Sequence, residues 1–307
     1  MPELPEVETV VRDLRSCLSG RRLTVVRQAS RQALRKRWRP DWNPAIAGQR
    51  VESLTRRGKW ILIVLENQAV LVVHLGMTGQ LTVVPVATPL ADHTHLIFDL
   101  ENGDEQLRFR DIRRFGSVTL FPTRQALEDA FARSCLGPEP FDVPAKYWRE
   151  CLHGSKRCLK AVLLDQSVVA GVGNIYADES LFEARLHPSR LACNLDNAEA
   201  DRLRRAVATV LRRAINRRGS SIRNYVGGSG LQGEYQNEFR VYGRTGKPCP
   251  RCGAAIESLR LAGRSSHYCP KCQKSETTKH TKYTKKRKEK SKKEKENHKY
   301  QPPTRFT

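Results

Sequence analysis

The first apolar positions of the chain recur at helical spacing. Val7, Val10, Val11, Leu14 and Leu18 lie three or four residues apart, so they would share one face of an α-helix. A proline and several glutamates accompany them, and both residue types suit the first turn of a helix. The pattern predicts an amphipathic helix at the beginning of the sequence.

Short runs of β-branched and aromatic residues follow this predicted helix. Turn residues separate the runs, and this spacing is typical of an antiparallel sandwich or barrel. The runs span residues 21–28, 59–66, 69–75, 95–100 and 117–121. We therefore predict an antiparallel β-sandwich with flanking helices over residues 1–135.

The periodicity becomes helical after "GPEPF" at residues 137–141, a composition typical of a linker. Helical spacing recurs over residues 145–165, 174–184 and 198–218. These segments predict a helical domain over 136–244. A cysteine-rich module over 245–273 and a Lys- and Glu-rich tail over 274–307 complete the predicted α+β multidomain chain.

Two Cys-x-x-Cys pairs, separated by 16 residues, lie in the cysteine-rich module. They consist of Cys249, Cys252, Cys269 and Cys272. Four thiolates satisfy tetrahedral Zn²⁺, and the spacing is that of a zinc ribbon. A pair of disulfides is the alternative, which a cytosolic chain disfavours. Because four cysteines leave no open coordination position, we predict one structural zinc ion and no catalytic cofactor.

The segment between the two cysteine pairs predicts a β-hairpin that carries Arg260 and Arg264. An arginine at the tip of a zinc-held hairpin suits a DNA groove or a phosphate. For either residue alone, a solvated arginine is the simpler interpretation.

The charge of the chain indicates a polyanionic partner. The formal net charge is +23 and the pI is near 10.0, which favours nucleic acid first and a membrane surface second. The tail after residue 272 holds 13 Lys and Arg against 4 Glu, so +14 remains in residues 1–272. We expect the tail to be disordered and to contact DNA weakly, with a solvated extension as the alternative.

The sequence favours a cytoplasmic protein. Its longest strongly apolar runs, such as "WILIVL", are too short to span a bilayer. Acidic residues stand where a signal peptide needs a basic segment and an apolar stretch.

Pro2 offers an unusual nucleophile. Met before Pro is commonly removed, which would leave a free secondary amine with a pKa of about 7.7–8.0. A helix that begins just beyond it would lower this pKa further. Attack of such an amine on a sugar aldehyde carbon gives a cationic iminium ion, and Glu3 stands beside it as an acid or base. Considered alone, the Met-Pro start favours no function, because most such prolines have none.

Six motifs favour a functional role for Pro2, because they occur together in this chain and in one order. They are "MPELPEVET", "RRGKW", "HLGMTGQL", "RDIRRFG", "GVGNIYADESLF" and the four-cysteine module. Over residues 1–273 the chain resembles the bacterial formamidopyrimidine-DNA glycosylase family, bifunctional repair enzymes for oxidised purines. The resemblance implies a β-sandwich, a helix–two-turn–helix domain and a zinc hairpin. It also implies a nucleoid-associated monomer that acts on damaged double-stranded DNA.

The resemblance implies five catalytic positions. Pro2 would attack C1′ of the damaged nucleotide to form a Schiff base, Glu3 would be the adjacent acid or base, and Glu6 would support the site. Lys59 would donate a proton during β-elimination and contact phosphate. Arg264 would bind phosphate and assist δ-elimination.

The resemblance also implies a set of DNA contacts, with a wedge of three residues that fills the space left by a flipped base. The set is His74, Met77, His93, Arg113, Phe115, Lys156, Asn174 and Arg223. A thioether and an aromatic ring suit insertion between bases, and an arginine suits the orphaned cytosine. One by one, these side chains have simpler interpretations as core fillers, surface charges or a helix cap.

Three positions depart from the family pattern. Ile112 stands where proline is frequent, Arg223 stands where lysine is common, and Ser155 interrupts a lysine cluster. Two alternative functions remain open at this stage. One is an oxidised-pyrimidine glycosylase of the endonuclease VIII type, which Leu4 disfavours because those relatives usually have glycine there. The other is a zinc-ribbon DNA-binding protein without catalysis.

Overall fold

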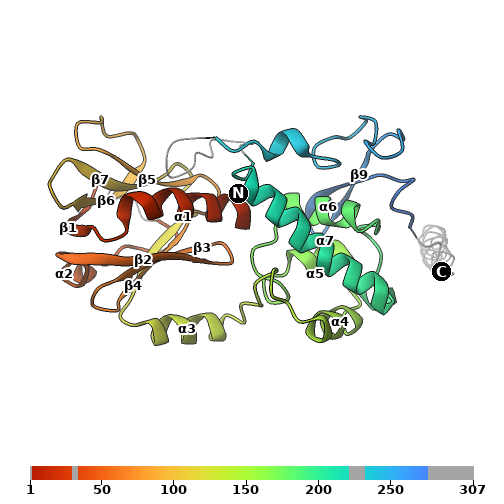
Figure 1. Cartoon of the computed structure of the whole chain (residues 1–307), viewed down its shortest axis with the longest axis horizontal. Helices are drawn as coiled ribbons and strands as arrows, with labels where there is room; N and C mark the ends of the chain where they lie inside the picture. Colours follow the sequence, from red (N-terminus) through yellow and green to blue (C-terminus); the bar gives the residue numbers. More distant parts are fainter. Residues whose placement is uncertain (1, 30–33, 221–231, 276–307) are drawn as a thin grey trace, which may run out of the picture.

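The computed structural model describes residues 2–29, 34–220 and 232–275, which form two lobes (Figure 1). Helix α1, Leu4–Leu18, begins between the lobes and runs along the first of them. All five apolar positions of the predicted N-terminal helix are buried in the core of the first lobe. The amphipathic pattern thus predicted this helix correctly.

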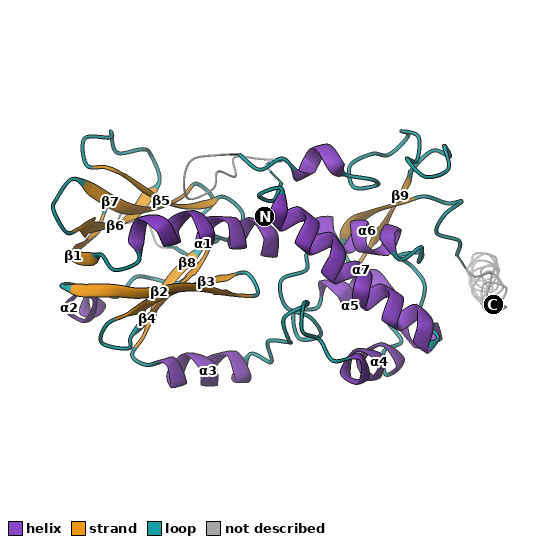
Figure 2. Ribbon diagram, viewed as in Figure 1, coloured by secondary structure: helices purple, strands orange, loops and turns teal. Residues whose placement is uncertain are grey.

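Eight antiparallel strands build the first lobe. They are β1 Arg22–Gln28, β2 Gln49–Arg57, β3 Trp60–Leu65, β4 Val70–His74, β5 Gly79–Pro85, β6 Thr94–Leu100, β7 Glu105–Asp111 and β8 Ser117–Phe121. Neighbouring strands pair in the order β5-β7-β6-β1-β2-β3-β4-β8. Strands β1 and β2 share only two residue pairs, and the two halves of the sheet enclose one core together with α1 (Figure 2). The predicted antiparallel β-sandwich is confirmed.

The hydrophobic pattern did not reveal strands β2, β5 and β7. Strand β2 is mostly polar, and β7 carries Arg108 with only 8% of its surface exposed. The guanidinium of Arg108 donates to three backbone carbonyls of the 86–89 loop, so a charge is accommodated inside the sheet.

The sequence predicted flanking helices for the first lobe, but not the positions of the three helical segments that follow α1. Helix α3, Arg124–Arg133, packs its buried Leu127 against the outer face of the sheet. A short turn of 3₁₀-helix, Pro40–Trp42, leads into α2, Asn43–Ile46.

The second lobe is mainly helical. Its helices are α4 Ala145–His153, α5 Leu159–Leu164, α6 Asn174–Glu183 and α7 Asn197–Asn216, with 3₁₀ turns at Ala192–Asn194 and Tyr235–Glu238. The continuous helical pattern over 145–165 is interrupted in the structure. Gly154 ends α4, and Cys158 has an extended backbone that starts α5 afresh. No helix among the described residues combines the length and apolarity needed to cross a bilayer.

The predicted hairpin is present as β9, Glu257–Leu261, and β10, Arg264–Tyr268. Ala262 and Gly263 make the turn with positive φ angles, so Arg264 is the first residue after the tip. Strand β10 packs against α6, which attaches the cysteine module to the helical lobe.

Candidate active site

A cleft of about 750 Å³ contains the predicted catalytic residues. Pro2, Glu3 and Glu6 come from the start of α1, Lys59 from the turn between β2 and β3, and Arg264 from the hairpin tip. All five line this one cleft, although they span most of the described chain. The structure therefore assembles the predicted catalytic set where the two lobes meet.

Hydrogen bonds between the lobes hold the start of α1 in this cleft. The Leu4 amide donates to the Gly171 carbonyl over 3.1 Å. Gly171 has a φ of +91°, and a Cβ there would stand 2.5 Å from the Leu4 side chain. Leu4 therefore packs directly on the glycine-rich segment that precedes α6.

The Glu3 carboxylate occupies the N-terminal end of α6. Its oxygens accept from the backbone amides of Ile175 at 3.0 Å and Tyr176 at 3.4 Å. Helix N-termini favour anions because their first amides lack partners within the helix. A Cβ at Gly173 would lie 2.3 Å from the Glu3 carboxyl carbon, so this approach requires glycine at position 173.

The environment of Glu3 suits a proton donor. Burial raises the pKa of Glu3 above its ordinary value, and the negative charge of Glu6 adds to this increase. The positive charge of Lys59 and the two amide hydrogen bonds act in the opposite direction. The net increase in pKa raises the fraction of Glu3 that is protonated near neutral pH, which a general acid requires.

Lys59 is buried at 8% exposure and reaches across to the helical lobe. Its Nζ donates to the Val172 carbonyl over 3.0 Å. Burial lowers the pKa of Lys59, and the nearby Arg264 charge lowers it further, whereas Glu3 and Glu6 raise it. A lysine with a lowered pKa exchanges protons more readily near neutral pH.

Glu6 holds several groups of the site in place. Its carboxylate accepts from the Glu3 amide at 2.8 Å, the Tyr176 hydroxyl at 2.5 Å and the Ser220 amide at 2.8 Å. The buried Tyr176 is a part of the site to which the sequence analysis assigned no role, although it lies within the motif "GVGNIYADESLF", the signal that could have found it. Glu6 thus contacts both lobes through one side chain.

The three predicted wedge residues lie on two neighbouring loops of the first lobe. Met77 and Arg113 line the cleft, and Arg113 stacks over the ring of Phe115 at 4.9 Å. Phe115 is 46% exposed even with Arg113 stacked on its ring, which is unusual for a phenylalanine. The buried Asp111 accepts from the Thr78 hydroxyl and the Arg113 amide, and so ties the two loops together.

The other predicted DNA contacts differ in their position relative to the cleft. Asn174 begins α6 and lines the cleft, whereas Lys156 and His93 are exposed. Arg157, rather than the predicted Lys156, lines the cleft, and it pairs with Asp165 at 2.7 Å. Arg223 lies outside the described residues.

His74 stands at the end of β4, partly buried beside Trp60. Its Nδ1 accepts from the Gly76 amide at 3.1 Å, which leaves Nε2 as the protonated nitrogen of the neutral ring. Burial lowers the pKa of His74 to about 4, and the Lys59 charge contributes. The neutral His74 ring therefore carries one N–H donor, at Nε2.

This low pKa predicts a measurable acid sensitivity. The unfolded chain protonates His74 near its ordinary pKa of 6.5, so between pH 7 and pH 5 the unfolded state binds more protons than the folded state. His74→Gln should reduce the stability lost over this range by about 2 kcal/mol. Urea denaturation of both proteins at the two pH values measures the difference. An identical pH dependence would contradict the neutral buried imidazole.

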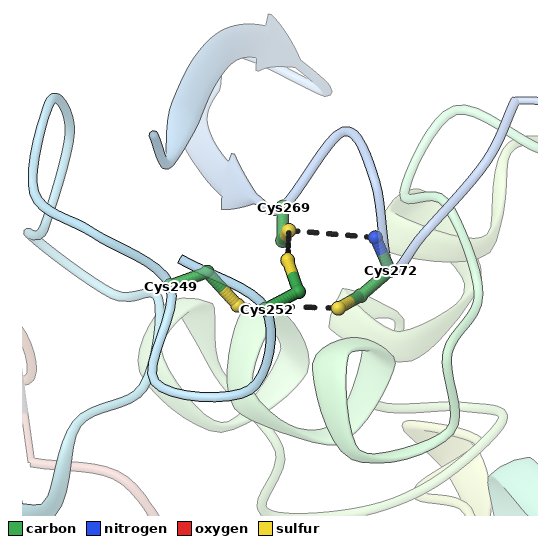
Figure 3. A group of neighbouring side chains, drawn as sticks. All are labelled: Cys249, Cys252, Cys269 and Cys272. Atoms are coloured by element: carbon green, nitrogen blue, oxygen red, sulfur yellow. Dashed lines mark hydrogen bonds between the residues drawn. The ribbon is translucent and has the colours of Figure 1, made fainter. Parts of the chain in front are cut away.

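The four cysteines of the predicted zinc site converge in the structure (Figure 3). All four sulfurs lie within 4.8 Å of one another. Cys252 Sγ is 3.4 Å from Cys269 Sγ, and Cys249 Sγ is 3.9 Å from Cys272 Sγ. Thiolates about 2.3 Å from one tetrahedral Zn²⁺ stand about 3.8 Å apart. The donor set and its spacing therefore fit one structural zinc ion.

Three models of known protein families match the chain. Residues 1–118 match the formamidopyrimidine-DNA glycosylase N-terminal domain, residues 136–226 match its H2TH domain, and residues 246–274 match the zinc finger found in FPG and IleRS. Together the matches include the start of α1, the GVGN segment and the four cysteines.

Curated relatives that match the chain are named formamidopyrimidine-DNA glycosylase, and the matches cover almost their whole length. A formamidopyrimidine-DNA glycosylase of Desulforamulus reducens is 44% identical over 279 residues, which is 90% of this chain and all of the relative. That of Moorella thermoacetica is 47% identical over 262 residues, 85% of this chain and 95% of the relative.

Solved structures agree with these matches. A mutant Lactococcus lactis FPG in complex with a Fapy-dG containing DNA has a TM-score of 0.84 and 34% identity, covering 89% of this chain and all of the other. MutM in complex with DNA that contains carbocyclic 8-oxo-G has a TM-score of 0.82 and 35% identity, with the same coverage. The motifs, the fold and the cleft of this chain are accordingly those of a member of the formamidopyrimidine-DNA glycosylase family.

Proposed function

We propose that this protein excises oxidised purines, 8-oxoguanine and formamidopyrimidines, from duplex DNA and then cleaves the strand. The observation that carries the proposal is that Pro2, Glu3, Lys59 and Arg264 line the same cleft as the wedge residue Met77. Relatives crystallised with Fapy-dG and 8-oxo-G DNA support this substrate class. Such an enzyme would act in the cytoplasm, at the nucleoid.

Pro2 is the proposed nucleophile once Met1 has been removed. Its nitrogen would form a bond to C1′ of the damaged nucleotide, while the bond between C1′ and the base breaks. The proton of the Pro2 amine passes to the departing base, the sugar ring opens at O4′, and the nitrogen lone pair completes a cationic iminium ion. The Pro2 ring needs no further proton to act as an electron sink.

Glu3 and Lys59 are the proposed proton carriers. A protonated Glu3 would supply the proton that sugar O4′ needs for ring opening, and its raised pKa supports this role. During β-elimination the Glu3 carboxylate, which has given its proton to O4′, would take the C2′ proton, and the bond from C3′ to oxygen would break. Lys59 would donate a proton to the leaving phosphate oxygen. Arg264 would hold a phosphate during δ-elimination, which breaks the bond from C5′ to oxygen.

The wedge loops would replace the base that leaves the helix. Flipping a base costs a few kcal/mol of unstacking, and a side chain that fills the gap offsets this cost. The exposed, stacked pair Arg113 and Phe115 supports this role, with Met77 beside them in the cleft. The cysteine module would bring Arg264 to the phosphates, and the basic folded part supports binding of DNA.

An excision assay on three duplexes tests this proposal. We expect single-turnover release of 8-oxoguanine opposite cytosine, followed by products cleaved on both sides of the sugar. Excision confined to oxidised thymine would instead assign the protein to the endonuclease VIII type. Zinc-dependent binding to both damaged duplexes without any cleavage, compared with an undamaged control duplex, would leave only a DNA-binding function.

A further inference from the structure

A fully buried ion pair lies behind the catalytic cleft and has no part in the proposed chemistry. Lys160 of α5 and Asp178 of α6 are both 0% exposed, and Lys160 Nζ is 2.5 Å from Asp178 Oδ1. A protein is often as stable or more stable when apolar residues of the same volume replace a buried ion pair. A contribution to stability alone therefore does not account for this pair. Its other hydrogen bonds indicate what it does.

The second oxygen of Asp178 holds the zinc hairpin. Asp178 Oδ2 accepts from the backbone amide of His267 at 2.9 Å and lies 3.0 Å from its Nδ1. Two residues earlier on β10, the Ser265 carbonyl accepts from Asn174 Nδ2 at 3.1 Å. Helix α6 therefore holds β10 at alternate residues, through one side chain near its start and one buried in its interior.

The cation of the pair extends the same network to the N-terminal end of α6. Lys160 Nζ also donates to the Asn174 carbonyl over 2.8 Å. The amides of the next two residues, Ile175 and Tyr176, bind the Glu3 carboxylate. One continuous set of hydrogen bonds thus connects the hairpin that carries Arg264 with the helix end that holds Glu3.

We propose that Asp178 is a positioning residue, which fixes the zinc hairpin to α6 and thereby sets Arg264 in the cleft for the second strand cleavage. The inference rests on the proposed function, because it assigns Arg264 to δ-elimination. Asp178 does not line the cleft, so it acts through the hairpin rather than on the DNA. Displacement of Arg264 should slow δ-elimination more than the earlier steps, which depend on Pro2 and Glu3.

The test compares two steps on a duplex with one abasic site, using full-length protein with its zinc content measured. Asp178→Asn removes the negative charge and leaves one side-chain oxygen to accept hydrogen bonds from both Lys160 and His267. We expect the δ-elimination step, which converts the product of β-elimination into the doubly cleaved product, to slow about tenfold. The adduct trapped by borohydride should form within about twofold of the wild-type rate. Asp201→Asn is the matched control, because its carboxylate pairs with Arg149 outside the cleft.

A double-mutant cycle with Arg264→Ala separates positioning from general destabilisation. If Asp178 acts through Arg264, Asp178→Asn should add no further loss of δ-elimination in the Arg264→Ala background. The inference would be overturned if the effects of the two substitutions on δ-elimination multiply in the double variant. A wild-type ratio of β- to δ-elimination products in Asp178→Asn, or an equal loss of adduct and of δ-elimination, would also overturn it.

A second variant covers the case in which Asp178→Asn does not fold or does not retain zinc. His267→Gln keeps the pair of Lys160 and Asp178, and the backbone amide at 267 still donates, so a smaller selective loss of δ-elimination is expected. A wild-type product ratio in His267→Gln would then overturn the inference. Absence of adduct and cleavage in the wild-type protein would refute the proposed function instead, which keeps the two failures distinct.

Discussion

Glu3→Gln is expected to slow the excision of 8-oxoguanine by about 10²–10⁴-fold, because the amide cannot donate the proton that general acid catalysis requires. Glutamine preserves the volume, and its oxygen still accepts one hydrogen bond from the amides that begin α6. Cleavage at a preformed abasic site should be affected much less, since the abasic sugar is a hemiacetal that opens to its aldehyde without the proton that Glu3 supplies to O4′. Single-turnover assays on the two duplexes measure this contrast.

The pH profile adds an independent signature. Because burial raises the pKa of Glu3, wild-type excision should fall as the pH rises through that pKa and the carboxyl group loses its proton. The residual activity of Glu3→Gln should lack this decrease. Glu52→Gln, an exposed carboxylate on β2 outside the cleft, is the matched control and should behave as wild type. Equal losses on both duplexes would refute the assignment of Glu3 as the acid that opens the sugar ring during excision.

Removal of zinc is expected to abolish the hairpin and, with it, tight DNA binding. The module has a core of only a few residues, among them Ile256 and two of the cysteines, so metal binding supplies most of its folding energy. Structural zinc sites contribute about 10–16 kcal/mol in isolated fingers. Cys269→Ser should lose the metal, lose hydrogen-exchange protection of β9 and β10, and bind damaged duplex at least about tenfold more weakly.

Cys17→Ser provides the control for this prediction. Cys17 is an exposed thiol on α1, far from the metal-binding cysteines in the sequence. The Cys17→Ser protein should retain one zinc ion per chain and wild-type affinity for DNA. A Cys269→Ser protein that keeps its hairpin protection without metal would show that packing against Phe182 and α6 is sufficient to fold the module.

Features with a local signal could be predicted from the sequence. Helix α1 follows from the spacing of Val7 to Leu18, and the zinc ligands follow from two Cys-x-x-Cys pairs. The hairpin that carries Arg264 follows from its position between the pairs. Each of these depends on residues close together in the chain, so periodicity and spacing are sufficient.

Features that depend on distant contacts could not be predicted in this way. Arg108 in β7 resembles a surface charge until the carbonyls of the 86–89 loop surround it. The pair of Lys160 and Asp178 lies in segments whose sequences predict ordinary helices, and only the packing of α5, α6 and β10 buries it. Which of Lys156 and Arg157 faces the cleft depends on the break between α4 and α5.

Borohydride trapping tests the central claim most directly. The purified protein is mixed with a duplex that carries 8-oxoguanine opposite cytosine, reduced, digested and mapped by mass spectrometry. We predict one covalent adduct on the nitrogen of Pro2, in protein that has lost Met1. An adduct on Lys59 or another lysine, or no adduct while the base is still released, would contradict catalysis through the N-terminal proline.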